Sequence, residues 1–340
     1  MRQLKFKVYF IANGHGLRKD AELLREMLVA LGYSCEIEES PGEADSSYYG
    51  KKAFYLFAKK INLLHFYKKI INRLLFSSEK TYSFHLEDIF FPALFRREHH
   101  VLIPNQEWFR SGNFELMQYI SHVWCKTRLA ESIFGQFHHK TSYIGFYSGI
   151  NPDLRDGEKY RDYFYTRVGS GRFRGAQILV DVWRKNPVWP NLKMVISPHL
   201  RPIHPPANVE FIDPFVDADE SYQLASSSLF HIYMTETEGF GHSIVEAMGY
   251  GALVIVTDAP PMNEITNSRS VLGVRAEYAG QKMLSPRFRA LPHSIEESVE
   301  KVLAMSDNEK NEITQNARAR FCELERQFTT NLALAIERLR

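Results

Sequence analysis

Residues 238–246 read Glu238-Gly239-Phe240-Gly241-His242-Ser243-Ile244-Val245-Glu246, which places two carboxylates on either side of a glycine-containing turn. The glycines let the backbone approach a ligand closely, and a helix beginning near Gly241 directs N–H groups and a partial positive charge toward it. Glu246 then lies one to two turns into that helix, where its carboxylate can accept hydrogen bonds from two neighbouring hydroxyls. The run therefore fits a ligand that carries both hydroxyl and phosphate groups.

The flanking sequence predicts a βαβ unit around this run. Residues 228–234 read as a buried strand, the helix ends at the glycines of residues 247–251, and residues 252–257 form the next strand. Strands joined in this way are parallel, and ligands of such sheets lie at the carboxyl ends of the strands.

A second strand and glycine-rich loop, earlier in the chain, also suit a phosphorylated ligand. Residues 165–169 read as a strand that enters a glycine-rich basic loop, followed by a helix over 177–185 and a strand ending at Ile196. Arginine keeps its charge and can fork onto phosphate oxygens, so Arg174, directly before Gly175, is predicted to contact a diphosphate. Arg172 is the second candidate, and the alternative for both arginines is a solvated loop charge.

These motifs resemble retaining glycosyltransferases of the GT-B fold, in particular the family-4-like group (glycosyl transferases group 1) with a Glu-x7-Glu motif. The similarity extends to residues 101–109, 123–127 and 143–146, and to the run Pro260-Pro261-Met262-Asn263-Glu264. The resemblance implies an α/β fold of two Rossmann-like, doubly wound domains that face a central cleft. It also implies transfer of a sugar, with a hexose expected, from a nucleotide-diphosphate sugar to a glycan, a lipid-linked acceptor or another hydroxyl, with retention of configuration.

The same resemblance implies roles for individual residues. Glu238 would bind the transferred sugar, Glu246 the ribose hydroxyls, and Arg174 would neutralise the diphosphate as its bond to the sugar breaks. The other residues implied in donor binding are Arg172, Gly239, Phe240, Gly241, His242, Ser243, Gly169, Asn263 and Glu264.

The first half of the chain also holds residues that are candidates for the substrate cleft. By resemblance, His85 after a strand would line the sugar side of the cleft as a catalytic group, and the loop with Gly14 and Gly16 would face the cleft. The alternatives are a hydrogen-bonded core histidine and a tight turn that packs a strand on a helix. His99 and His100 are expected to be solvated in a charged turn.

The domain organisation follows from the polar turn formers of residues 151–158. An acceptor-side domain is expected over 1–150 and a donor-binding domain over 151–325. By resemblance, a last helix over 326–340 crosses back to the first domain. The helices expected near the carboxyl end cover 295–304, 308–325 and 330–340.

Composition limits the class of protein. With 340 residues, 24% charged and 44% hydrophobic, the chain is large enough for two globular domains, and a net charge of +2 favours neither nucleic acid nor membrane as a partner. Its three cysteines are scattered and show neither a disulfide framework nor a zinc spacing. Neither a signal peptide nor a spanning run of roughly 20 apolar residues is visible, so a cytoplasmic location is expected, or one on the cytosolic face of a membrane.

Residues 51–76 are the exception to this even charge, since they hold seven Lys or Arg and no Asp or Glu among many apolar residues. A basic amphipathic helix of this kind can lie on an anionic membrane or hold an anionic acceptor. The alternative is a helix whose apolar side packs on the sheet while its lysines are solvated.

No metal site is expected. Asp217-Ala218-Asp219 is formally a D-x-D motif, but it lies far from the Glu pair in sequence and is interpreted as a helix cap before Glu220. Arginines and a helix amino terminus can stabilise a leaving diphosphate without a divalent ion or another cofactor.

Two other functions are compatible with a fold of this class. A Rossmann oxidoreductase needs G-x-G-x-x-G after a strand, which neither Gly14-His15-Gly16 nor Gly169-Ser170-Gly171 completes. A non-catalytic sugar-nucleotide or glycan-binding protein of the same fold stays open as the alternative.

Overall fold

The computed structural model describes residues 4–11, 15–40, 80–90, 93, 94, 96, 98–150, 159–169, 171–214 and 218–339. The chain divides into two compact units. The N-terminal unit is Met1–Gly145 together with Thr329–Arg340, and the C-terminal unit is Phe146–Phe328. Gly14, Asp217 and residues 51–76 and 151–158 lie outside the described residues, as does the side chain of Asp219.

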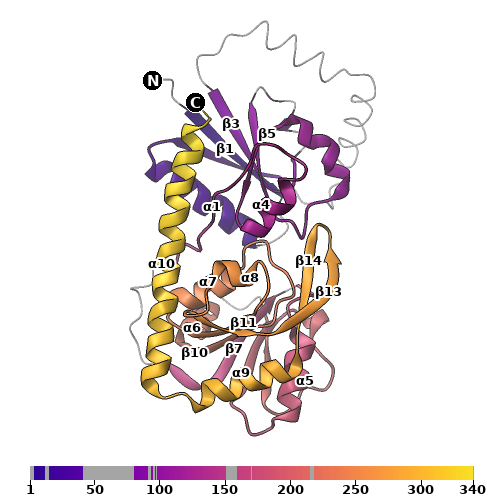
Figure 1. The fold of residues 1–340 in the computed structure, drawn as a ribbon, viewed down its shortest axis with the longest axis vertical. Helices are drawn as coiled ribbons and strands as arrows, with labels where there is room; N and C mark the ends of the chain where they lie inside the picture. Colours follow the sequence, from indigo (N-terminus) through magenta and orange to yellow (C-terminus); the bar gives the residue numbers. More distant parts are fainter. Residues whose placement is uncertain are drawn as a thin grey trace, which may run out of the picture. The chain divides into compact units, whose positions relative to one another are not determined.

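The described part of the N-terminal unit is built on a six-stranded parallel sheet in the order β2-β1-β3-β4-β5-β6 (Figure 1). Helix α1 (His15–Ala30) packs on β1 to β3, and α4 (Arg128–Phe134) packs on β5 and β6, with the 3-10 helix η2 (Ser111–Tyr119) before β5. The strands are β1 (Leu4–Ile11), β2 (Ser34–Ser40), β3 (Lys80–Glu87), β4 (His99–Pro104), β5 (Ile120–Cys125) and β6 (Thr141–Tyr143).

The inner strands β3, β4 and β5 of this sheet are mostly buried, as is typical of a parallel sheet, whereas the edge strand β2 is mostly polar. Phe6 and Phe84 of the neighbouring strands β1 and β3 are fully buried and stack with ring centroids 5.3 Å apart. Trp124 of β5 packs against Phe84 at 5.2 Å. Burial of such large rings supplies most of the stabilisation of this core.

The described part of the C-terminal unit holds a second six-stranded parallel sheet, in the order β12-β11-β10-β7-β8-β9. From β7 the chain steps outward through β8 and β9, then returns to the other side of β7 and steps outward again through β10, β11 and β12. The order reverses between β7 and β10, so this is the topological switch point of a doubly wound sheet. The strands are β7 (Tyr160–Gly169), β8 (Asn191–Ile196), β9 (Val209–Ile212), β10 (Ser228–Tyr233), β11 (Leu253–Thr257) and β12 (Val271–Val274).

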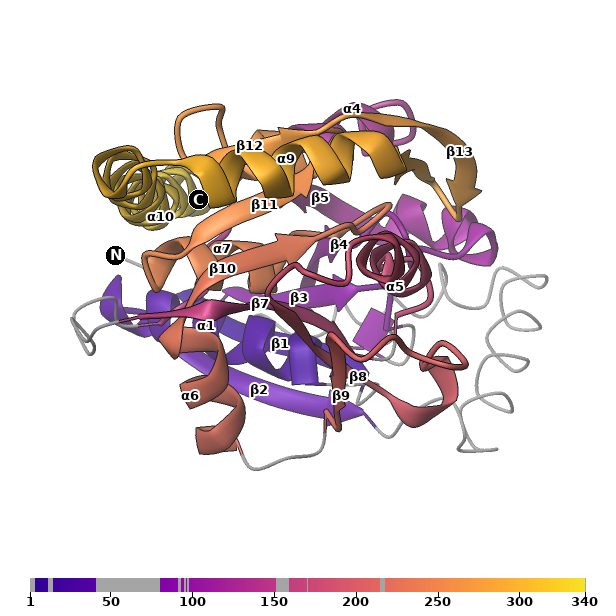
Figure 2. The same cartoon turned by 90° about the horizontal axis from the view of Figure 1, so that it is seen from below.

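Helices cover both faces of this second sheet. Successive side chains of β7 point to opposite faces, and apolar residues of β7 are buried on each face. Phe164 and Val168 pack with α5 (Ala176–Lys185) and α9 (Pro292–Ala304) on one face. Tyr163 and Tyr165 pack near α6 (Ala218–Ser227) on the other. Figure 2 shows α9 and α6 on opposite sides of β7 and β10. The remaining short helices are η4 (Pro198–Leu200), α7 (His242–Gly249) and α8 (Met262–Ile265).

A two-stranded antiparallel hairpin, β13 (Ala276–Lys282) and β14 (Ser285–Ala290), was not expected from the sequence (Figure 1). Its side chains are mostly half-exposed. The sequences of the two strands, AEYAGQK and SPRFRA, also lack the sustained alternation of apolar and polar residues that predicts a half-buried strand.

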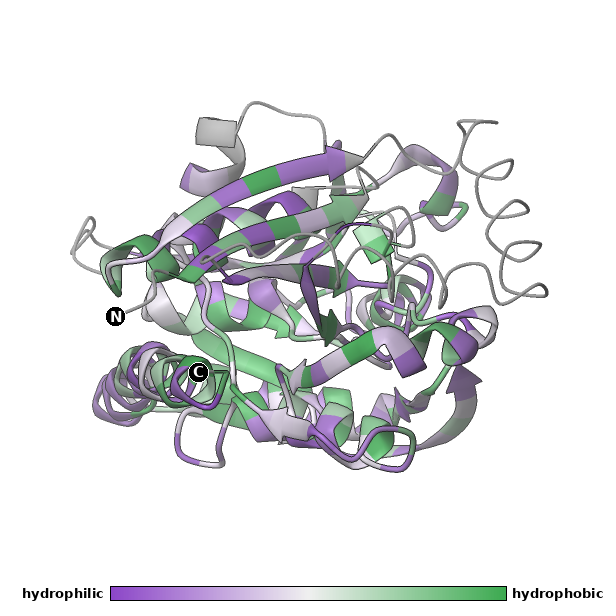
Figure 3. Cartoon of the chain, turned by 90° about the horizontal axis from the view of Figure 1, so that it is seen from above, coloured by the Kyte–Doolittle hydropathy of each residue, from purple (hydrophilic) through white to green (hydrophobic). Residues whose placement is uncertain are grey.

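The carboxyl end differs from the expected helices over 308–325 and 330–340, since one helix, α10 (Asp307–Glu337), covers both (Figure 1). Figure 3 shows hydrophobic and hydrophilic residues interspersed along it. Neither Gly nor Pro occurs in α10, and its buried residues keep helical spacing, so nothing in the sequence ends the first helix. These buried residues are Ala317, Phe321, Leu324, Phe328, Leu332, Ala335 and Ile336.

The last turns of α10 and the residues after it belong to the N-terminal unit and bond to other parts of it. The Tyr82 hydroxyl donates to the carbonyl oxygen of Leu339 at 2.5 Å, and Asn331 Nδ2 donates to the carbonyl oxygen of Ile144 at 3.3 Å. Among the described residues, no helix is both long and apolar enough to span a membrane.

Candidate functional site

Two loops follow the strands at the switch point of the C-terminal sheet, and one ion pair joins them. Arg174 follows β7 and Glu238 follows β10, and these strands are hydrogen-bonded neighbours. Arg174 Nη1 lies 3.0 Å from Glu238 Oε1, and Nη2 donates to Oε2 at 3.1 Å. The Glu238 side chain is 7% exposed and that of Arg174 is 35% exposed. The structure thus joins the two residues that the sequence predicted for the reacting centre, and leaves the cation accessible to solvent.

Two glycines fix the position of Arg174. Gly175 has φ 75° and is the N-cap of α5, and a Cβ there would collide with the backbone oxygen of Met234 in the adjacent loop. A Cβ on Gly171 would lie 2.8 Å from Arg174 Nε. The Arg174 side chain therefore packs directly on the backbone of Gly171, in space that a Cβ atom would fill.

Gly241 starts α7 in the same manner, with φ 94°. Neither Gly175 nor Gly241 supplies a side-chain capping bond, so the first N–H groups of α5 and α7 are not used by an N-cap side chain. Both helix termini follow strands at the switch point, where their dipoles favour an anion. Ser243 lies in the first turn of α7, and Gly239 in the loop before it.

Glu246 is half-buried in α7 among tyrosines that the sequence analysis did not single out. Burial, opposed by Arg167 and assisted by Glu246, raises the pKa of Tyr165 to about 12. Burial and the charge of Glu246 also raise the pKa of Tyr233 and of Tyr250 well above the ordinary value. These phenols stay protonated and can donate hydrogen bonds. They come from β7, β10 and the end of α7, so only the sheet brings them together.

His242 is held by Ser148, which the sequence analysis also missed. Ser148 Oγ lies 2.7 Å from His242 Nδ1 and is fully buried. Phe240, nearly buried, packs edge-on against His242 and Phe146 with centroids 5.2 and 5.6 Å apart. Ser148 precedes His242 by 94 residues, and no local pattern connects the two.

Asn263 and Glu264 lie in α8, after the cis peptide bond between Pro260 and Pro261. Asn263 is exposed and donates from Nδ2 to Asp258 Oδ1 at 3.1 Å. The backbone oxygen of Glu264 accepts from Arg320 of α10 at 3.0 Å. A Cβ on Gly241 would lie 3.0 Å from Ile265 Cδ1, so α8 borders the loop before α7.

The other two donor candidates lie in the loop that Arg174 occupies. Gly169 ends β7 with φ 61°, and its oxygen accepts from Ser197 N at 2.9 Å. Arg172 is exposed.

His85 does not fit the role expected of it. It is fully buried, with Nε2 3.2 Å from His100 Nδ1, while Nδ1 accepts from Phe90 N at 3.1 Å. Both ring nitrogens are engaged in the interior, which matches the alternative of a hydrogen-bonded core histidine. His100 is likewise buried in β4, so the expectation of a solvated turn was wrong for it.

Gly16 lies within the first turn of α1 and is exposed, instead of lying in the loop before that helix. A Cβ there would meet no atom within 4 Å, so no close backbone approach requires glycine. Gly14 of the same motif lies outside the described residues.

A buried polar network occupies the carboxyl edge of the N-terminal sheet. The Lys126 ammonium bonds to Asp20 of α1 and donates to Asn105 Oδ1 at 3.0 Å. Asn105 Nδ2 in turn donates to Glu87 Oε2 at 3.1 Å, and Glu87 ends β3 with φ 67°. The side chains of Lys126 and Asp20 are 1% and 4% exposed, so this pair is closed to solvent, whereas Glu87 at the end of the network is half-buried.

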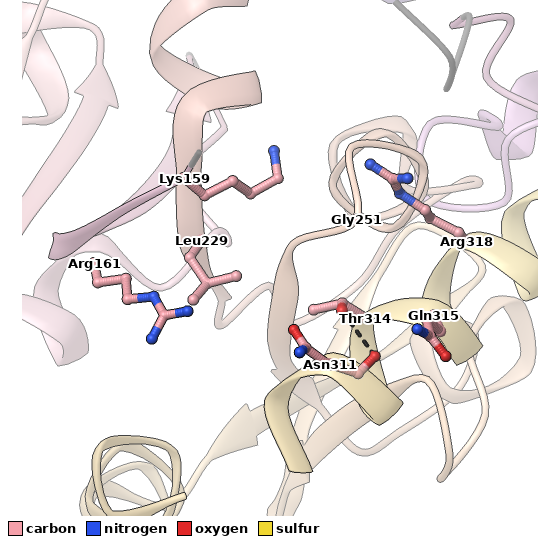
Figure 4. A pocket seen from close by; sticks show the side chains of 8 residues that line it. All are labelled: Lys159, Arg161, Leu229, Gly251, Asn311, Thr314, Gln315 and Arg318. Atoms are coloured by element: carbon pink, nitrogen blue, oxygen red, sulfur yellow. Dashed lines mark hydrogen bonds between the residues drawn. The ribbon is translucent and has the colours of Figure 1, made fainter. Parts of the chain in front are cut away.

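A pocket of about 270 Å³ lies at the other edge of the C-terminal sheet (Figure 4). Lys159 and Arg161 of this pocket sit at the start of β7, which spans ten residues, or about 30 Å, up to the loop of Arg174. Lys159 donates to the Ser226 oxygen at the end of α6, and Arg161 pairs with Asp307 at 2.5 Å. Arg318 packs against Gly251, at the end of α7. The pocket is separate from the candidate site because it lies at the opposite end of β7. Its cations bond to the end of α6 and to Asp307.

Within the described ranges, no group of three or more His, Cys, Asp or Glu residues could hold a metal ion. The D-x-D motif is not among the groups tested, because Asp217 and the Asp219 side chain are not described. Metal independence stays a prediction.

Comparison with known proteins gives matches by structure alone. No family model and no curated protein sequence matches the chain. A glycosyltransferase from Rickettsia africae ESF-5 is similar in structure, with a TM-score of 0.65, 13% identity and coverage of 100% of this chain and 99% of that one. Anabaena Alr3699/HepE, solved in complex with UDP-glucose, has a TM-score of 0.65 and 13% identity over 98% and 99% of the two chains.

A third similar structure is the apo form of the lipopolysaccharide outer core galactosyltransferase WaaB. Its TM-score is 0.61, with 10% identity over 99% of this chain and all of that one. All three likenesses run the full length of both chains and cover both six-stranded α/β units. The chain therefore has the fold of GT-B glycosyltransferases, built from two Rossmann-like units.

Proposed function

We propose that this protein transfers a hexose from a nucleotide-diphosphate sugar to a glycan or lipid-linked acceptor. The observation that carries the proposal is the Arg174–Glu238 pair at the switch point of the C-terminal sheet, beside two helices whose N-caps are glycines. A cation, two helix termini with glycine N-caps and a carboxylate together suit a ligand with a diphosphate next to a sugar.

Arg174 binds the diphosphate in this proposal. Without ligand, its guanidinium forks onto Glu238, and a diphosphate offers the same bidentate geometry with more charge. Binding therefore transfers Arg174 from the carboxylate to phosphate oxygens. Glu238 is then released to accept hydrogen bonds from the hydroxyls of the sugar.

Glu246 binds the ribose. Its carboxylate accepts from the two vicinal hydroxyls, and the phenols whose pKa its charge helps to raise stay protonated beside it. Gly239, Phe240, Gly241, His242 and Ser243 line the loop and first turn beside it, with Asn263 and Glu264 on the neighbouring α8. The UDP-glucose bound to the similar HepE supports a uridine-diphosphate sugar as the first donor to test.

The reaction proceeds with retention in this proposal. No carboxylate is assigned as a covalent nucleophile, so the acceptor hydroxyl attacks the anomeric carbon on the face from which the diphosphate leaves. The sugar–diphosphate bond breaks through an oxocarbenium-like state, and the hydroxyl proton passes to the leaving phosphate. Arg174 and the helix termini stabilise the charge that develops, without a divalent ion. We further propose a cytoplasmic location for the protein, with residues 51–76 as the candidate segment for contact with the anionic face of a membrane.

A thermal-shift panel of UDP-, GDP-, ADP- and CMP-sugars tests the proposal. One class of donor should raise the unfolding temperature, since a ligand at a hundred times its Kd stabilises the native state by about 2.7 kcal/mol. Incubation of that donor with glycan acceptors should release the nucleoside diphosphate, and EDTA should leave the rate unchanged. Binding without hydrolysis or transfer would favour the non-catalytic alternative, and loss of activity in EDTA restored by magnesium or manganese would overturn metal independence.

A further inference from the structure

The β13–β14 hairpin is bonded to the loop that carries Glu238. Phe288 N donates to the Glu236 oxygen at 2.8 Å, and the buried hydroxyls of Thr237 and Ser285 lie 2.7 Å apart. Glu236 N donates in turn to the Phe173 oxygen at 2.7 Å. The hairpin, the β10–α7 loop and the β7–α5 loop thus form one hydrogen-bonded series.

The Glu236 carboxylate lies between two arginines of β14. Arg287 Nη1 is 3.4 Å from its Oε2, and Arg289 Nε is 3.2 Å from its Oε1. The side chains of Glu236 and Arg287 are 12% and 16% exposed, whereas that of Arg289 is 55% exposed. Arg289 donates the hydrogen bond to this carboxylate from the solvent side, where exposed pairs contribute little, whereas Arg287 is the more buried of the two cations.

Arg287 also reaches the loop of Arg174. Its guanidinium lies over the ring of Phe173, 4.2 Å from the centroid, and Phe173 directly precedes Arg174. The same guanidinium bonds to the Ala279 oxygen on the other strand of the hairpin. One side chain therefore touches the hairpin and both loops that carry the ion pair.

We propose that the β13–β14 hairpin fixes the geometry of the Arg174–Glu238 pair, with Arg287 as a positioning residue for sugar transfer. The catalytic consequence rests on the function proposed above. The positioning itself is a property of the ligand-free protein and can be measured without a substrate.

Amide hydrogen exchange tests the positioning. In Arg287→Ala, the amides of Glu236 and Phe288, and those of residues 171–176, should exchange about tenfold faster than in the wild type, because the loops open locally more often. Arg289→Ala is the matched control, since it removes an exposed arginine from the same strand and the same carboxylate, and should change these rates less than twofold. Equal exchange in Arg287→Ala and Arg289→Ala would overturn the proposal.

A double-mutant cycle tests the consequence for turnover. Arg287→Ala should lower kcat about tenfold and change the KM for the donor less, while Arg287→Lys should recover part of the loss because the charge remains. If Arg287 acts through Arg174, then Arg287→Ala should add less than a twofold loss in an Arg174→Ala background. Independent, multiplying losses would contradict a positioning role.

The two measurements separate the two proposals. If the wild type transfers no sugar from any donor, the proposed function fails, while the exchange rates still decide whether the hairpin holds the loops. If Arg287→Ala does not fold, Phe173→Leu replaces it, because it removes the ring under the guanidinium and keeps the ion pair. The same amides should then exchange faster, and unchanged rates would overturn the proposal.

Discussion

The two parallel sheets carry polar groups at the same place, the carboxyl edge, but bury them to different degrees. In the N-terminal unit, the side chains of Lys126 and Asp20 are 1% and 4% exposed. In the C-terminal unit, those of Arg174 and Glu238 are 35% and 7% exposed. The first pair is enclosed by further hydrogen bonds, whereas the second keeps its cation at the surface. The position in the fold is therefore shared, and access to solvent distinguishes a structural ion pair from one that can exchange its partner for a ligand.

The physical basis is the cost of leaving a charge alone. A fully buried ammonium that loses its carboxylate has no water to replace it, so the pair stays closed and stabilises one conformation. A half-exposed guanidinium can be hydrated while it changes partner, so exchange of a carboxylate for a diphosphate is feasible.

The largest effect is expected on the closed side. Lys126→Ala leaves the Asp20 carboxylate buried without its ammonium, which should lower the free energy of unfolding by about 3–5 kcal/mol in urea denaturation. The double variant Asp20→Asn with Lys126→Met removes both charges and should recover most of the loss. A single-variant loss below about 1 kcal/mol would mean that water reaches this network.

On the open side, the larger effect should fall on turnover. Arg174→Ala should slow transfer about a hundredfold to a thousandfold at saturating donor, since removal of one electrostatic donor has this effect elsewhere. Its loss of stability should be smaller than that of Lys126→Ala, because removal of the 35% exposed Arg174 side chain opens its place to water, which can hydrate the Glu238 carboxylate left behind. Arg174→Lys should recover part of the rate.

Arg172→Ala compares the second arginine of this loop with Arg174, and because Arg172 is exposed it should slow transfer less than Arg174→Ala. Wild-type turnover in a folded Arg174→Ala would reassign the diphosphate contact, with Arg172 as the next candidate.

Binding of the nucleotide sharpens the comparison further. Glu246→Gln keeps the shape of the side chain but replaces a charged acceptor, so donor affinity should fall by about 1.5–3 kcal/mol in calorimetry. Glu300→Gln on α9 is the matched control, since it neutralises an exposed glutamate outside the candidate site and should leave affinity unchanged. An unchanged affinity in Glu246→Gln would remove Glu246 from the site.

The smallest effect concerns pH and the sheet under the site. Burial lowers the pKa of His231 in β10 from its ordinary 6.5 to about 3. The unfolded chain therefore binds a proton between these two values while the folded chain does not, so stability falls as the pH drops below 6.5. The contribution of His231 should be about 1 kcal/mol between pH 6.5 and 5.5.

Urea denaturation of the wild type and of His231→Gln at both pH values isolates this contribution, since glutamine does not titrate. Identical pH dependence in the two proteins would show that His231 is already protonated when folded, or accessible to water.

The sequence predicted several strands of the two sheets where apolar runs end in glycine or polar residues, but it predicted neither β9 nor β12. Strands β7, β10 and β11 lie close to their expected places, as do the loops of Arg174 and Glu238. Prediction from the sequence failed where the structure depends on residues that are far apart in the chain or on a pattern that the sequence lacks. The hairpin lacks an apolar alternation, α10 continues through residues 326–329, and His85 packs inside because its partner His100 comes from the next strand.

The sequence by itself determined the parallel α/β class, the two glycine-started helices and the residue types that can meet a phosphorylated sugar. These features depend on neighbours within a few positions, such as Gly175 before α5 and Gly241 before α7. Only the tertiary structure decided that Arg174 forks onto Glu238, that tyrosines surround Glu246, and that Arg287 touches both loops. Parallel strands bring together side chains from distant segments, and burial then sets their charge, so neither can be read from adjacent residues.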